Sequence, residues 1–78
     1  MKAYIRSLET EFSLIENGFK EEERRALADY KSNGTEYIKE VAFLAYQSDT
    51  YQVRMYGVFL FGFLSEQKDI LVGIRLIG

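Results

Sequence analysis

The side chains that carry most enzyme chemistry are scarce in this sequence. It contains neither Cys nor His, which excludes disulfides, thiolate nucleophiles, Cys/His zinc sites and imidazole bases. Any metal would therefore require oxygen ligands alone. Carboxylates are the remaining candidates, and they occur as the consecutive Glu21, Glu22 and Glu23 and as the pair Glu36 and Glu40.

Neither group of carboxylates has the arrangement that a site needs. Consecutive helical residues point about 100 degrees apart, so the three glutamates do not converge on one ion and indicate a solvated helix start. Glu36 and Glu40 share a helix face, but their polar surroundings offer nothing to raise a pKa. No phosphate-binding loop, dinucleotide fingerprint or nucleophile elbow occurs. The sequence predicts no catalytic residue, no metal site and no cofactor.

Helical periodicity organises the first half of the chain. Apolar residues recur three or four apart in three segments, and Asn17-Gly18 and Asn33-Gly34 separate the segments as left-handed helix ends. Thr35 is placed to cap the third helix. The expected inward positions are Tyr4, Ile5, Leu8, Phe12 and Ile15, then Phe19, Leu27 and Tyr30, then Ile38, Val41, Ala42, Leu44 and Ala45.

An apolar run at residues 51–64 dominates the second half. A segment this apolar on every side is stable as a helix only where neighbours cover it, which favours stacked helices. Asp49 is predicted to cap this fourth helix, and Ser65 to start a fifth. Gly57 and Gly62 lower its helix propensity, so we expect close helix approach on two sides. The fifth helix would turn inward Ile70, Leu71, Ile74 and Ile77.

An alternative interpretation makes residues 41–46, 53–64 and 70–77 β-strands, because Val, Ile, Phe and Tyr are frequent there. It would correspond to a small β-containing inhibitor or immunity protein. The absence of proline and the position of the Asn-Gly pairs between helical patterns favour helices.

Charge and hydropathy limit the class of protein. The net charge of −2 comes from 10 basic and 12 acidic residues, which are mixed along the chain and form no basic stripe for nucleic acid. The N-terminal residues do not form a secretory signal. The longest uncharged stretch of the apolar run, residues 55–65, is shorter than the roughly 20 residues that span a bilayer. We expect a cytoplasmic protein that forms one domain over residues 1–78.

The turn before the apolar run, together with the run itself, has a more specific likeness. HEAT-type repeats place an Asp in the turn, then a Val-Arg pair, a small residue and large apolar residues. Residues 48–60, SDTYQVRMYGVFL, resemble that pattern, with Thr50 in place of the usual proline and Gly57 in place of the usual alanine. Residues 53–65, VRMYGVFLFGFLS, are similar to the N-terminal part of the bacterial DNA alkylation repair family of the AlkD type.

This resemblance implies an all-α fold of antiparallel helical hairpins, stacked as a short HEAT-like solenoid of about five helices. It also implies that residues 1–78 are the N-terminal piece of a longer solenoid. The family lifts alkylated bases from duplex DNA, a DNA glycosylase-type repair activity, without a metal or organic cofactor. Its catalytic Asp, Trp and Arg lie on later repeats and this chain has no Trp, so we expect no complete active site.

The resemblance also gives roles to single residues and names partners. Such solenoids approach DNA through their concave face and helix ends, which makes Arg54 a candidate phosphate contact. Its alternative role is structural, with Asp49 and Gly57, in tying one repeat to the next. Expected partners are duplex DNA, and further repeats or a second copy covering the apolar C-terminal helix; no membrane is expected. The rival function is a protein interaction module or homo-oligomer that uses that helix.

Overall fold

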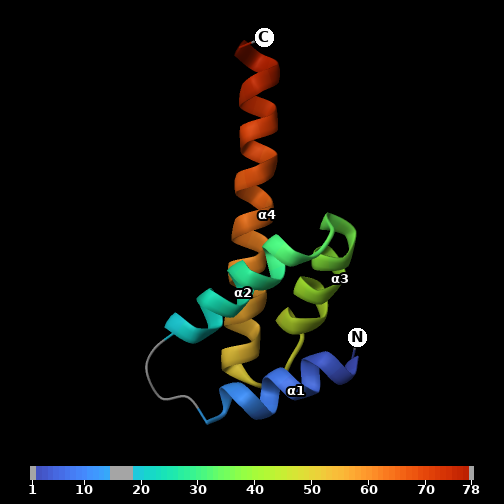
Figure 1. Cartoon of the computed structure of the whole chain (residues 1–78), viewed down its shortest axis with the longest axis vertical. Coiled ribbons are helices and arrows are strands. Elements are labelled where there is room, and N and C mark those ends of the chain that lie inside the picture. Colours follow the sequence, from blue (N-terminus) through green and yellow to red (C-terminus); the bar gives the residue numbers. More distant parts are fainter. Residues whose placement is uncertain (1, 15–18, 78) are drawn as a thin grey trace.

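The protein is all-α. The computed structural model describes residues 2–14 and 19–77, and it describes side chains through residue 66. No strand occurs in the described residues, so the β interpretation of residues 41–46 and 53–64 is wrong. The helices of this part are α1 (Lys2–Phe12), α2 (Lys20–Ser32), α3 (Thr35–Tyr46) and α4 (Tyr51–Ile77) (Figure 1).

The helices form successive antiparallel hairpins around α4, as the HEAT-like prediction requires. Figure 1 shows α3 running opposite to α4, α2 crossing α4 obliquely, and α1 across the end where α4 begins. The last turns of α4 extend beyond the other helices. α4 packs most extensively against α3 and α2. No helix in the described part of the chain is both long and apolar enough to cross a bilayer.

The core confirms most of the predicted inward faces. Helices α1 and α3 bury the residues that their periodicity predicts, although Tyr4 and Leu44 are only partly covered. Ile15 lies outside the described residues. The buried apolar residues are Ile5, Leu8 and Phe12 of α1, Ala26 of α2, Ile38, Val41, Ala42 and Ala45 of α3, and Val53, Tyr56 and Leu60 of α4.

Helix α2 turns inward a face that differs in part from the one predicted. It buries Glu22 and Ala26, and the predicted Tyr30 packs half-buried against the core, whereas Leu27 is 37% exposed and Phe19 is partly exposed. The small Ala26 allows α2 to approach its neighbours closely, and residues four apart share a face, so Glu22 follows Ala26 inward. The expectation that all three consecutive glutamates are solvated is therefore wrong for Glu22.

Helix α2 ends at the predicted Asn-Gly pair, but through a different geometry. Asn33 and Gly34 are both extended rather than left-handed, and the Asn33 side-chain amide donates to the Asp29 carbonyl at 2.9 Å. That bond satisfies one of the free carbonyls of the last turn. Gly34 in turn is the N-cap of α3, and its carbonyl accepts from the Ile38 amide. Thr35 is the first helical residue rather than the cap.

Two further helix boundaries differ from prediction. Helix α4 begins at Tyr51, and the Thr50 carbonyl accepts from the Arg54 amide at 3.1 Å, so Thr50 takes the N-cap position expected for Asp49. Ser65 lies inside α4, which merges the predicted fourth and fifth helices. Neither proline nor a left-handed residue interrupts the backbone there, so the helix continues. The predicted inner face of the fifth helix and Asn17-Gly18 lie outside the residues whose side chains are described.

Candidate functional site

The turn between α3 and α4 positions Arg54. Its guanidinium Nη1 donates to the Ser48 carbonyl at 2.8 Å, and its guanidinium carbon Cζ lies 5.5 Å from the ring centre of Tyr51. Arg54 thus reaches the turn, as its spacing predicts, through a backbone carbonyl and not through the Asp49 carboxylate. These contacts support the structural role and leave the phosphate contact a prediction.

Ser48 joins this turn to α1. Its hydroxyl donates to the Glu9 carboxylate at 2.5 Å and accepts from the Thr50 amide at 3.1 Å. Ser48 is buried, so these bonds satisfy polar groups that would otherwise be desolvated. Glu9, which lies beside the exposed cations of α1, is therefore anchored to the α3–α4 turn.

Gly57 permits the close contact between α3 and α4. A Cβ atom at this position would lie 2.9 Å from the Tyr46 backbone nitrogen, 3.0 Å from the Ala42 carbonyl oxygen and 3.1 Å from the Ala45 Cβ. By contrast, a Cβ at Gly62 would meet nothing within 4 Å. The expected close approach thus occurs at Gly57, while the expected neighbour on the Gly62 side is absent from the described residues.

A polar network of two tyrosines and an aspartate connects α1, α2 and α4. Tyr4 and Tyr56 each donate a hydroxyl to Oδ2 of Asp29 at 2.5 Å, and Arg25 Nε donates to the Tyr4 oxygen at 3.1 Å. Arg25 also pairs with Glu11 at 3.1 Å. Burial and the bond to Asp29 raise the pKa of Tyr56 far above its usual range, so its proton is fixed. The network is a structural connection.

Removing one donor from this network measures its contribution. We expect Tyr56→Phe to lower the free energy of unfolding by about 1 to 2 kcal/mol, because the lost bond goes to a charged acceptor. Urea denaturation followed by circular dichroism measures the change. Tyr37→Phe is the matched control, because Tyr37 is an exposed tyrosine of α3. Equal stabilities of the two variants would contradict the network's role.

The other candidate carboxylates remain at the surface. Glu21 pairs with Arg24 at 2.7 Å, which lowers the pKa of Glu21 through the hydrogen bond and the charge. Glu36 pairs with Lys39 at 3.5 Å on the exposed face of α3, and Glu40 is also exposed. No three Asp or Glu side chains of the described residues cluster as metal ligands.

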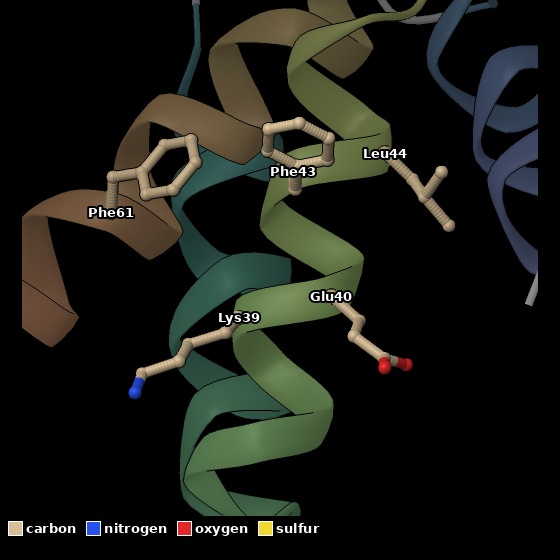
Figure 2. A pocket seen from close by; sticks show the side chains of 5 residues that line it. All are labelled: Lys39, Glu40, Phe43, Leu44 and Phe61. Atoms are coloured by element: carbon tan, nitrogen blue, oxygen red, sulfur yellow. The ribbon is translucent and has the colours of Figure 1, made fainter.

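Two surface hollows flank α3. One, of about 550 Å³, is lined by Lys39, Glu40, Phe43, Leu44 and Phe61 (Figure 2). The other, of about 240 Å³, lies between α1 and α3 and is lined by Lys2, Ile5, Arg6, Glu9, Leu44 and Gln47. The exposed lining of the first hollow is mainly apolar, whereas the lining of the second includes the cations Lys2 and Arg6. Sequence reasoning missed both, although Phe43 falls outside the inward face of α3 in the helical period.

The fold and these sites define a class: a chain of antiparallel helical hairpins packed as HEAT-like repeats, with structural polar links between them. The chain is 70% identical to AlkD2 from Streptococcus mutans, with 95% of this chain and 36% of that chain covered and a TM-score of 0.81. It is 65% identical to smu.31 from Streptococcus mutans UA159, with 95% and 34% covered and a TM-score of 0.76.

This chain thus has the HEAT-like helical-repeat fold and is similar to AlkD-type proteins, so the resemblance seen in residues 53–65 is confirmed. It spans about a third of the length of these two proteins. No protein-family model and no curated protein matches it.

Proposed function

We propose that this chain is a scaffold segment of a DNA alkylation repair-like protein, that it contacts duplex DNA, and that it holds no complete active site. The observation that supports this function is the similarity to AlkD2 over 95% of the chain. The described residues fit a scaffold, because hydrogen bonds from Tyr4 and Tyr56 to Asp29 join α1 and α4 to α2, and the bond from Ser48 to Glu9 joins the α3–α4 turn to α1.

Among the described side chains, exposed cations without an ion pair lie on α1, as Lys2 and Arg6, and on α2, as Lys20 and Lys31, and only the α1 pair lines a hollow. Ion pairs occupy Arg24, Arg25 and Lys39, and Arg54 donates to the α3–α4 turn. Lys2 and Arg6 are exposed, lie four residues apart, and form no ion pair with another described residue. Residues four apart share a helix face, so both can meet one phosphate backbone. The α1–α3 hollow is therefore the proposed DNA contact, in place of Arg54.

Salt dependence tests this proposal. Each phosphate contact releases counterions, so the logarithm of the affinity falls with the logarithm of salt concentration by roughly 0.9 per contact. We expect the double variant Lys2→Gln, Arg6→Gln to reduce that slope by about 2 in fluorescence anisotropy with a labelled duplex. Lys31→Gln is the control, because Lys31 is an exposed cation on the last turn of α2.

The possible results are distinct. A smaller slope in the double variant, with an unchanged slope in the control, supports a DNA contact at the α1–α3 hollow. If the protein shows no affinity for duplex DNA at low salt, the DNA function is wrong. Affinity that scarcely responds to salt would instead indicate apolar docking, which screening affects little.

A further inference from the structure

An acidic side chain, Glu9, lies among the cations of the α1–α3 hollow. Lys2 and Arg6 line the same hollow, and Arg6 lies three residues before Glu9 on α1. Side chains three apart on a helix are neighbours, so an ion pair between Arg6 and Glu9 is within reach. Such a pair would neutralise a guanidinium that the proposed DNA contact needs for phosphate.

That ion pair does not form, because the Glu9 carboxylate is bonded elsewhere. Its Oε2 accepts from the Ser48 hydroxyl at 2.5 Å, a bond that joins α1 to the α3–α4 turn. The Arg6 side chain is exposed and forms no ion pair with a described residue. Ser48 is buried, and a hydrogen bond from a buried hydroxyl to a carboxylate is stronger than an ion pair that water and salt screen. Ser48 therefore competes successfully with Arg6 for the carboxylate.

Ser48 is held in place by contacts that do not involve Glu9. Its amide donates to the Ala45 carbonyl at 3.0 Å, and its carbonyl accepts from Arg54 at 2.8 Å. Its hydroxyl oxygen accepts from the Thr50 amide at 3.1 Å, which leaves the hydroxyl proton for Glu9. The turn thus fixes Ser48, and Ser48 fixes the position of the carboxylate.

We propose that Ser48 is a positioning residue for phosphate binding at the α1–α3 hollow. Its hydroxyl holds the Glu9 carboxylate toward the α3–α4 turn and so leaves the Arg6 guanidinium free for a DNA phosphate. This inference rests on the proposed function, because it assigns a role within the same contact. It concerns Arg6 and not Lys2, since Lys2 precedes Glu9 by more than the three or four residues at which helical side chains pair.

The salt dependence of duplex binding tests the proposal through two variants that release the carboxylate. Ser48→Ala removes the donor, and Glu9→Asp shortens the acceptor by one methylene, so that it no longer reaches Ser48. In both variants the released carboxylate pairs with Arg6. We expect the slope of the logarithm of affinity against the logarithm of salt to fall by roughly 0.9, the value of one phosphate contact. Ser13→Ala is the control and leaves the slope unchanged, because the exposed Ser13 hydroxyl donates to the Thr10 carbonyl at 2.8 Å, outside the hollow.

A Glu9→Gln background separates positioning from a structural link between α1 and the turn. Glutamine keeps an oxygen that accepts from Ser48 but carries no charge to place on Arg6. Ser48→Ala is therefore expected to leave the slope of this background unchanged. A role confined to joining α1 to the turn predicts the same loss of slope in both backgrounds, and that result would overturn the proposal. Unchanged slopes for both Ser48→Ala and Glu9→Asp would overturn it as well.

The state of the Arg6 guanidinium can also be measured without DNA. A guanidinium held by a carboxylate exchanges its Nε proton with water more slowly than a free one. Nitrogen-edited NMR at low salt is therefore expected to show slower exchange at Arg6 in the Ser48→Ala chain than in the unmodified chain. Glu9→Asp gives the same comparison with the buried hydroxyl and its bond from Thr50 intact, so it decides the matter if Ser48→Ala loses its fold by circular dichroism.

This measurement distinguishes the failure of the two proposals. Equal exchange rates in the unmodified and variant chains overturn the role of Ser48, whether or not DNA binds. If the unmodified chain binds no duplex, the proposed function is wrong, while slower exchange in the variants still supports the role of Ser48 in keeping Arg6 unpaired.

Discussion

Replacing Glu22 with leucine is expected to stabilise the fold at neutral pH by about 2 to 3 kcal/mol. Glu22 is fully buried on α2, and neither oxygen of its carboxylate has a hydrogen-bond partner. A buried and unpaired charge loses its hydration without compensation, whereas an apolar side chain gains from the same burial. Urea denaturation at pH 7 measures the difference in the free energy of unfolding.

The pH dependence of this gain has a defined sign. Burial raises the pKa of Glu22 above its ordinary value of 4.5, and the charge of Glu21 adds to that shift. Below pH 4.5 both the folded and the unfolded states are protonated, so burial of the carboxyl has little electrostatic cost. As the pH rises through the raised folded pKa, the unfolded state binds fewer protons and stability is lost. The gain from Glu22→Leu is therefore smallest in acid and largest at neutral pH.

Glu23→Leu is the matched control for Glu22→Leu. Both substitutions remove an acidic residue from the first turn of α2, where the helix dipole favours it by about 0.3 to 1 kcal/mol. Only Glu22 is buried, because the side chain of Glu23 is exposed. Equal effects of the two substitutions, or a destabilised Glu22→Leu protein at pH 7, would contradict the cost assigned to the buried carboxylate.

The period of the apolar residues predicted the fold class and most of the core. In α1 and α3 the large apolar side chains repeat along one face of each helix. Only that face can turn toward a core, so the burial of Leu8 and Ile38 could be predicted. In α2 the pattern is weak, because charged residues surround Ala26, and local periodicity therefore favoured the larger Leu27. Because α2 packs closely against α4, the small Ala26 faces inward and Leu27 does not. How closely the two helices pack depends on the assembled hairpins and cannot be read from the α2 sequence alone.

The polar links could not be predicted from spacing. Tyr4 and Tyr56 are 25 and 27 residues from Asp29 in the sequence, and the three residues lie on different helices. No local pattern therefore joins them. The same limit applies to Ser48 and Glu9, whose bond spans 39 positions. Helix ends were misplaced by single residues because the Asn33 side chain and the Gly34 and Thr50 carbonyls satisfy the backbone four residues away, and the Thr35 and Asp49 side chains do not act as the expected caps.

Gly57→Leu is expected to destabilise the protein by about 3 kcal/mol. The sequence correctly predicted a close helix approach at Gly57. The new Cβ would lie 2.9 Å from the Tyr46 nitrogen and 3.0 Å from the Ala42 oxygen. Both are backbone atoms of α3, so relief requires α3 and α4 to separate. That separation loses contacts along the whole hairpin and outweighs the gain in helix propensity, which is at most about 1 kcal/mol.

Gly62→Leu provides the control for Gly57→Leu within the same helix. It makes the same chemical change five residues further on, where a Cβ meets nothing within 4 Å. It is expected to raise the free energy of unfolding by about 0.5 to 1 kcal/mol, because only helix propensity changes. The two substitutions are expected to change the free energy of unfolding in opposite directions, because only Gly57 lies in the tight contact between α3 and α4. Similar thermal midpoints for the two variants would show that the hairpin is more loosely packed there than these distances indicate.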